Sequence, residues 1–140
     1  MANADVDYIR WFNGLGIADV PLVGGKNASL GEMVSTLSTR GIRVPNGFAI
    51  TAEAYRHTLD QADAWPRLHA ALDGLDASDV DDLAHRAQRA RELIHGAPLP
   101  PDLTAQITAA YARLQAEYGP ALTLAVRSSA TAEDLPTASF

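Results

Sequence analysis

The N-terminal part of the chain alternates short apolar runs with turns rich in glycine and proline. Residues 8–12 (YIRWF) are aromatic or β-branched around one arginine, and this run predicts a short strand. Apolar residues then recur at helical spacing over residues 28–37, which predicts a helix that begins just after a glycine pair. Residues 48–50 (FAI) predict a second strand, because the Pro-Asn-Gly before them cannot continue a helix.

The middle of the chain is rich in alanine, leucine, arginine and aspartate, which favours helices. Between residues 65 and 118 we expect three helices, separated by Asp73-Gly74 and by the proline-rich residues 97–101. A further helix follows the strand at residues 48–50. The expected helix starts are marked by Thr51 as a cap, by Ser78 with Asp81 as a capping box, and by Pro101 in a first turn.

A last apolar run at residues 122–126 (LTLAV) predicts a third strand, which leads directly into a polar loop at residues 127–134. Strands at both ends of the chain and helices between them predict a mixed α/β (α+β) fold. We expect a single domain over residues 1–140, with a helical insert at about residues 60–118.

Charge and composition narrow the classes of function. The formal net charge is -6 and the pI is near 5.0, so the chain lacks the general basic field that binds nucleic acid or an anionic membrane. No apolar run approaches the roughly 20 residues that span a bilayer. The absence of cysteine excludes disulfides, thiolate metal sites and cysteine nucleophiles, and is compatible with a cytoplasmic location.

The glycine pair Gly24-Gly25 is the first candidate for chemistry. Two adjacent glycines let backbone N–H groups approach an anion, and the helix that follows presents its positive end to the same place. Lys26 adds a full charge, so the turn suits a nucleotide phosphate, although it is not the P-loop pattern. The alternative is an ordinary turn into a helix with a solvated lysine, in which Asn27 is only the cap.

The second candidate is Arg127, which follows an apolar strand and precedes the hydroxyl residues Ser128, Ser129 and Thr131. A guanidinium group at a strand end can hold phosphate oxygens in a bidentate way. Glu133 and Asp134 are candidates for a cation that accompanies the nucleotide, because Mg²⁺ prefers carboxylate and phosphate oxygens together. In the alternative interpretation, Arg127 pairs with one of these carboxylates on the surface.

The four histidines, at positions 57, 69, 85 and 95, fall in or beside predicted helices among alanine, arginine and aspartate. Nothing near them suggests a nucleophile, and a metal site would need more ligands. We therefore expect them to be solvated.

Three segments, VGGKNASLGEM at 23–33, VPNGFAIT at 44–51 and AVRSSATAEDLP at 125–136, together resemble the start of the phosphoenolpyruvate synthase (pyruvate, water dikinase) family. The resemblance runs over residues 11–140 and is least specific in the alanine-rich helices. It implies the first part of an ATP-grasp-like nucleotide-binding domain in which Lys26 and Arg127 contact ATP phosphates. The remaining residues of this implied site are Gly24, Gly25, Ser128, Ser129 and Thr131.

The resemblance also implies a reaction in which ATP, with Mg²⁺, phosphorylates a histidine on a separate domain and yields AMP and phosphate. The phosphohistidine then phosphorylates pyruvate on a further domain. Neither of these domains is expected in this chain, none of its histidines matches the phosphohistidine context, and no catalytic residue is carried over. Because the motif breaks off at Ser139-Phe140, we expect a partial ATP-binding domain that is inactive alone.

Two other interpretations stay open. The chain could be a stand-alone regulatory or interaction module that kept the fold without turnover, in which case it would bind a protein partner. It could also begin a related phosphotransferase, since pyruvate, phosphate dikinase and rifampicin phosphotransferase share the architecture.

Overall fold

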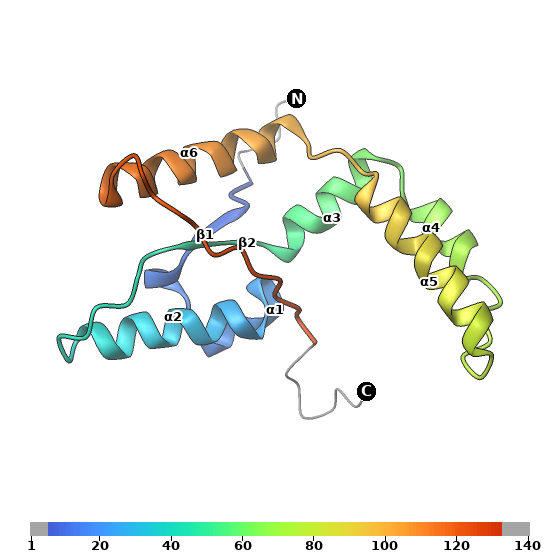
Figure 1. The fold of residues 1–140 in the computed structure, drawn as a ribbon, viewed down its shortest axis with the longest axis horizontal. Coiled ribbons are helices and arrows are strands. Elements are labelled where there is room, and N and C mark those ends of the chain that lie inside the picture. Colours follow the sequence, from blue (N-terminus) through green and yellow to red (C-terminus); the bar gives the residue numbers. More distant parts are fainter. Residues whose placement is uncertain (1–5, 133–140) are drawn as a thin grey trace. The chain divides into compact units, whose positions relative to one another are not determined.

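A computed structural model describes residues 6–132 of the 140-residue chain, and within them it confirms a mixed α/β fold with a small sheet (Figure 1). The elements are β1 (Ile9–Trp11), two 3-10 turns η1 (Phe12–Gly14) and η2 (Ile17–Asp19), α1 (Val20–Val23), α2 (Gly25–Ser38), β2 (Phe48–Ile50), α3 (Ala52–Gln61), α4 (Trp65–Leu72), α5 (Val80–His95) and α6 (Pro101–Tyr118).

The chain divides into two compact units. The first unit combines Met1–Ala54 with Asp102–Phe140, and the second is Tyr55–Pro101. Helix α6 thus belongs with the N-terminal elements, and the separate helical unit ends at the first residue of α6. In the part of the chain described by the structure, no helix has the length and apolar character needed to cross a membrane.

The sheet of the first unit consists of β1 and β2, which pair antiparallel with Ile9 opposite Ile50 and Trp11 opposite Phe48. The rings of Trp11 and Phe48 lie 5.6 Å apart, a cross-strand aromatic pair that stabilises the register. Both strands were predicted from their sequence pattern, and both predictions are confirmed. Because η1, η2, α1 and α2 lie between the two strands in sequence, the pairing brings distant parts of the N-terminal segment together.

The third predicted strand, at residues 122–126, is wrong. This stretch has no strand structure in the described chain, and Val126 and Leu124 are 90% and 47% exposed. A strand requires a neighbouring strand for its backbone N–H and C=O groups, and the described sheet contains only β1 and β2. Local apolar character alone therefore did not make a strand here.

Helix α6 packs on the N-terminal segment within the first unit. Leu103 forms a buried cluster with Tyr8 and Ala54, which Ile107 extends. The Gln106 side chain holds the incoming chain by accepting from the Tyr8 backbone N–H at 2.8 Å. These contacts explain why α6 belongs with this unit although it follows the helical unit in sequence.

The helical unit is built around α4 and α5. Leu59, Ala64 and Leu68 form its buried cluster.

The expected helix starts at Thr51 and Pro101 are confirmed. Thr51 Oγ1 accepts from the Ala54 N–H at 3.3 Å, and α6 begins at Pro101.

The predicted cap of α5 is displaced by one residue. Asp79, not Ser78, is the N-cap, and one of its carboxylate oxygens accepts from the N–H groups of Asp81 and Asp82, each at 3.1 Å. The Ser78 hydroxyl instead donates to Asp76 at 2.6 Å. A carboxylate is at least as good a cap as a hydroxyl, so the aspartate one position later takes the role.

Candidate functional site

The glycine pair lies at the start of α2, as predicted. Gly24 is the N-cap with φ 82° and ψ 162°, a conformation that side chains rarely adopt, and Gly25 is the first helical residue. Both glycines are buried, and Lys26 in the next position is partly exposed. Asn27 is not the cap: its side-chain Nδ2 reaches back and donates to the Val23 carbonyl at 2.8 Å.

The segment around Ser129 lies against this helix start (Figure 1). The Ser129 hydroxyl donates to the Val23 carbonyl at 2.9 Å and accepts from the Asn27 N–H at 3.4 Å, across 106 and 102 positions of sequence. One residue further, the Ala130 carbonyl accepts from the Gly25 N–H at 3.2 Å. The two motifs singled out in the sequence therefore meet in space.

Gly24 makes this approach possible. A Cβ atom added at Gly24 would collide with the Ser129 hydroxyl and would lie 2.9 Å from the Ala130 carbonyl oxygen. The position thus needs glycine both for its positive φ and for the chain that crosses it. The glycine pair in the sequence indicates the unusual backbone conformation but not the chain segment that crosses it.

Among the expected site residues, the contacts bring together Gly24, Gly25 and Ser129, with Lys26 between the bonded Gly25 and Asn27. Arg127 and Ser128 lie just before Ser129 and are exposed, and Thr131 is exposed beyond Ala130. The candidate cation ligands Glu133 and Asp134 lie outside the described residues.

Sequence reasoning missed the roles of Val23, Asn27 and Ala130. Val23 and Ala130 act through backbone carbonyls, which leave no mark in the sequence. The Asn27 side chain also bonds to a backbone carbonyl, so its partner could not be identified from the sequence either.

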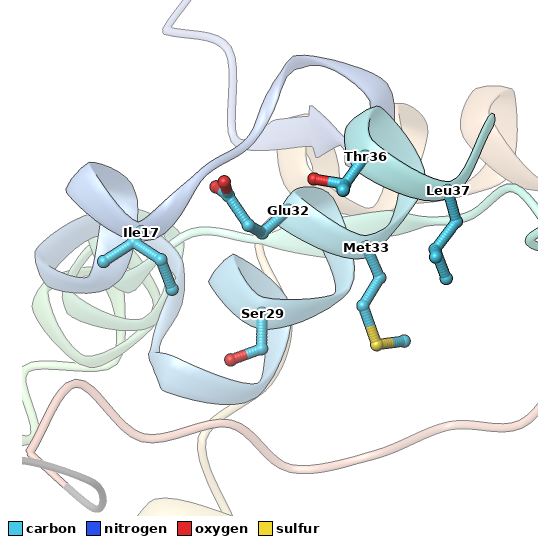
Figure 2. A pocket seen from close by; sticks show the side chains of 6 residues that line it. All are labelled: Ile17, Ser29, Glu32, Met33, Thr36 and Leu37. Carbon is cyan, nitrogen blue, oxygen red and sulfur yellow. The ribbon is translucent and has the colours of Figure 1, made fainter. Parts of the chain in front are cut away.

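A shallow hollow of about 300 Å³ lies beside α2. Figure 2 shows Met33 and Leu37 extending from one side of the helix, with Ile17 of η2 beside Ser29. A second hollow, of about 250 Å³, lies where Arg113 of α6 stacks on Trp11 at 4.1 Å. Neither hollow is lined by Gly24, Lys26 or Arg127.

Metal-binding side chains do not gather in the described structure. Over residues 6–132, no group of three or more histidine, aspartate and glutamate residues is placed to hold an ion. The strongest candidate site is the start of α2 with the Ser129 segment against it. Its positively charged side chains are the groups that could bind a ligand.

A helix start with an adjoining lysine and arginine is typical of sites for nucleotide phosphates. Residues 20–140 match the sequence profile of the family described as pyruvate phosphate dikinase, AMP/ATP-binding domain. The chain belongs to this family of ATP-binding domains.

Individual relatives carry a more specific name. The chain is 52% identical to the phosphoenolpyruvate synthase of Neisseria meningitidis over 135 residues, and 49% identical to that of Escherichia coli K12 over 138 residues. It is 44% identical to the phosphoenolpyruvate synthase of Synechocystis over 145 residues. These matches cover 96%, 99% and 100% of the chain, but the chain spans only 17 to 18% of the length of the relatives.

Proposed function

We propose that this chain supplies part of the ATP-binding site of a phosphoenolpyruvate synthase, with Lys26 and Arg127 as the groups that bind ATP phosphates. The observation that supports this most is the contact between the two motif segments: Ser129 bonds to Val23 and Asn27, on either side of the glycine pair. This contact places the backbone of Lys26 and the loop of Arg127 at one helix start. Gly24, Gly25, Ser128, Ser129 and Thr131 complete the proposed site.

The chemistry of the site is phosphate binding by positive charge. A charged donor to a phosphate oxygen makes a shorter and stronger hydrogen bond than a neutral donor, and arginine can offer two parallel N–H groups. Both side chains lie in a chain with net charge -6, so the positive charge they bring is local. The ATP-grasp-like architecture implied by the family resemblance is part of this proposal.

In the full-length enzyme, the proposed reaction converts ATP, pyruvate and water to AMP, phosphate and phosphoenolpyruvate through a phosphohistidine on another domain. None of the histidines of this chain is proposed as that group. Mg²⁺ is expected to accompany ATP, and Glu133 and Asp134 are its proposed ligands. We assign no Mg²⁺ ligand among residues 6–132, since no group of three or more histidine, aspartate and glutamate side chains is placed there to hold an ion. A cytoplasmic location, where ATP and pyruvate are available, is part of the proposal.

Two alternatives have support. The family is described by the name of pyruvate phosphate dikinase, which favours a related phosphotransferase as a second candidate. The exposed apolar side chains of Ile17 and Met33 beside α2, 58% and 44% exposed, favour an interaction module as a third. An interaction module would bind its partner with the same affinity in the presence and absence of ATP.

The test uses a full-length phosphoenolpyruvate synthase that carries this chain as its matched segment, which we call the carrier enzyme. Lys26→Ala and Arg127→Ala should each lower kcat/KM for ATP about ten- to hundredfold, the loss of about 1.5–3 kcal/mol from one charge-assisted hydrogen bond. The matched control is Arg56→Ala, which removes an exposed arginine from α3 and should change kcat/KM less than about twofold.

Retention of the original kcat/KM for ATP by both folded variants would show that the site is assigned wrongly. A drop of the same size in Arg56→Ala would show that loss of any positive charge weakens the enzyme. The proposal requires the difference between the two motif residues and the control.

A further inference from the structure

The Ser129 hydroxyl has partners within the protein for both of its hydrogen-bonding functions. It donates its hydrogen to the Val23 carbonyl at 2.9 Å and accepts the Asn27 N–H at 3.4 Å. The first distance is that of a good hydrogen bond and the second is long, so the bond to Val23 is the stronger one. The residue is partly buried, unlike its exposed neighbours Ser128 and Ala130.

These bonds join two pieces of chain that carry the proposed phosphate-binding charges. Lys26 lies between Gly25 and Asn27, whose N–H groups bond to Ala130 and Ser129. Arg127 lies two residues before Ser129 and is exposed. The position of the Arg127 backbone relative to Lys26 is therefore fixed through Ser129 and its neighbour.

We infer that Ser129 is a positioning residue. Its two hydrogen bonds, which we call the clip, hold the Arg127 loop at the start of α2 so that Arg127 and Lys26 can bind the same phosphate group. This inference rests on the proposed function and gives Ser129 an indirect role in the proposed ATP site. The hydroxyl acts through Arg127 and does not need to touch ATP. Gly24 is the complementary half of the clip, because any side chain there would collide with Ser129.

The geometry of the clip is tested in the 140-residue chain itself, without ATP. Ser129→Ala removes the acceptor of the Asn27 N–H, so the exchange of this amide hydrogen with solvent should become at least about threefold faster. Amide exchange measured by NMR gives this rate residue by residue. Ser35→Ala is the matched control, since it removes an exposed α2 hydroxyl that donates to the Glu32 carbonyl and should leave Asn27 unchanged.

The role in positioning is tested in the carrier enzyme. Ser129→Ala should lower kcat/KM for ATP about three- to tenfold. If the hydroxyl acts through Arg127, the same change made in an Arg127→Ala background should cost less than about twofold, because the residue it positions is gone. Ser129→Thr, which keeps the hydroxyl, should retain more activity than Ser129→Val, which has a methyl group in its place. This pair tests the clip even if the alanine variant folds poorly.

Three results would overturn the inference: an unchanged exchange rate at Asn27, an unchanged kcat/KM in Ser129→Ala, or equal losses in the presence and absence of Arg127. The last result would mean that Ser129 contacts ATP independently. Failure of the proposed function has a different signature: Lys26→Ala and Arg127→Ala would be without effect while the exchange at Asn27 still responded to Ser129→Ala.

Discussion

Gly31 in the middle of α2 offers a test in which helix propensity and packing predict opposite signs. Glycine in a helix interior costs about 1 kcal/mol relative to alanine, so propensity alone predicts that Gly31→Ala stabilises the protein. In the structure, however, Gly31 is buried against Leu15 in the turn before η2. An added Cβ would lie 2.5 Å from the Leu15 Cβ, 2.5 Å from its carbonyl oxygen and 2.7 Å from its carbonyl carbon.

The magnitude follows from these distances. Ordinary contact with a Cβ begins at 3.4 Å, so the carbonyl oxygen at 2.5 Å would have to move by 0.9 Å, the difference between the two. Two of the three atoms belong to the backbone and cannot rotate away. Overpacking costs about 1–3 kcal/mol, and we take the upper end here. After subtraction of about 1 kcal/mol for propensity, Gly31→Ala should lower the free energy of unfolding by about 2 kcal/mol.

The assay is urea unfolding of the 140-residue chain in a Trp65→Phe background. Trp11 is then the remaining tryptophan, and its fluorescence reports on the first unit, which contains Gly31. The control is Gly14→Ala, because a Cβ at Gly14 would have no atom within 4 Å and the change should stay within about 0.5 kcal/mol. An increase in the stability of Gly31→Ala would refute the close packing of α2 on Leu15.

Two further predictions concern helix capping and pH. Asp79→Ala should lower the free energy of unfolding by about 1 kcal/mol, measured by loss of helical circular dichroism in urea. Ser78→Ala should lower it less, and the opposite order would show that Ser78 is the cap. Burial, together with the negative charges of Asp102 and Glu53, raises the pKa of Tyr8 above its ordinary 10.0. Stability from this shift is present below pH 10.0 and is lost as pH rises through the folded pKa of Tyr8. The free energy of unfolding should therefore fall less steeply at alkaline pH in Tyr8→Phe than in the original protein, and an identical pH profile in both proteins would contradict this prediction.

The elements that were predicted correctly carry their signals locally. The strand at Phe48–Ile50 follows a Pro-Asn-Gly turn, and α6 begins with the proline that marks its first turn. The failed strand at residues 122–126 had an equally apolar sequence, but a strand depends on a partner that the sequence of the segment does not specify. The two confirmed strands, Ile9–Trp11 and Phe48–Ile50, pair with each other, whereas residues 122–126 have no partner strand in the described structure.

The candidate site divides in the same way. Gly24, Lys26 and Arg127 stood out because glycine pairs and charges at element ends have a recognisable chemistry. The bond from Ser129 to the Val23 carbonyl could not be predicted, because its acceptor is a backbone atom that every residue possesses. The sequence thus supplied the charged groups of the site, and the structure supplied the contact that holds them together.

That contact changes which groups are expected to bind phosphate most strongly. The N–H groups of Gly25 and Asn27, which the sequence offered as an anion cradle, donate to the Ala130 carbonyl and the Ser129 hydroxyl. An anion would have to share or displace these oxygens to use the same donors, and breaking a made hydrogen bond offsets much of the gain. Lys26 and Arg127 instead bring full positive charges, which make stronger hydrogen bonds to phosphate oxygens than neutral N–H groups do. These oxygens carry only partial negative charge, so they offset the positive end of the α2 dipole only in part, and the remaining field favours an anion beside these two side chains. We therefore expect the side-chain charges to contribute most of the phosphate affinity, and the glycine turn to contribute chiefly by letting the Arg127 loop approach.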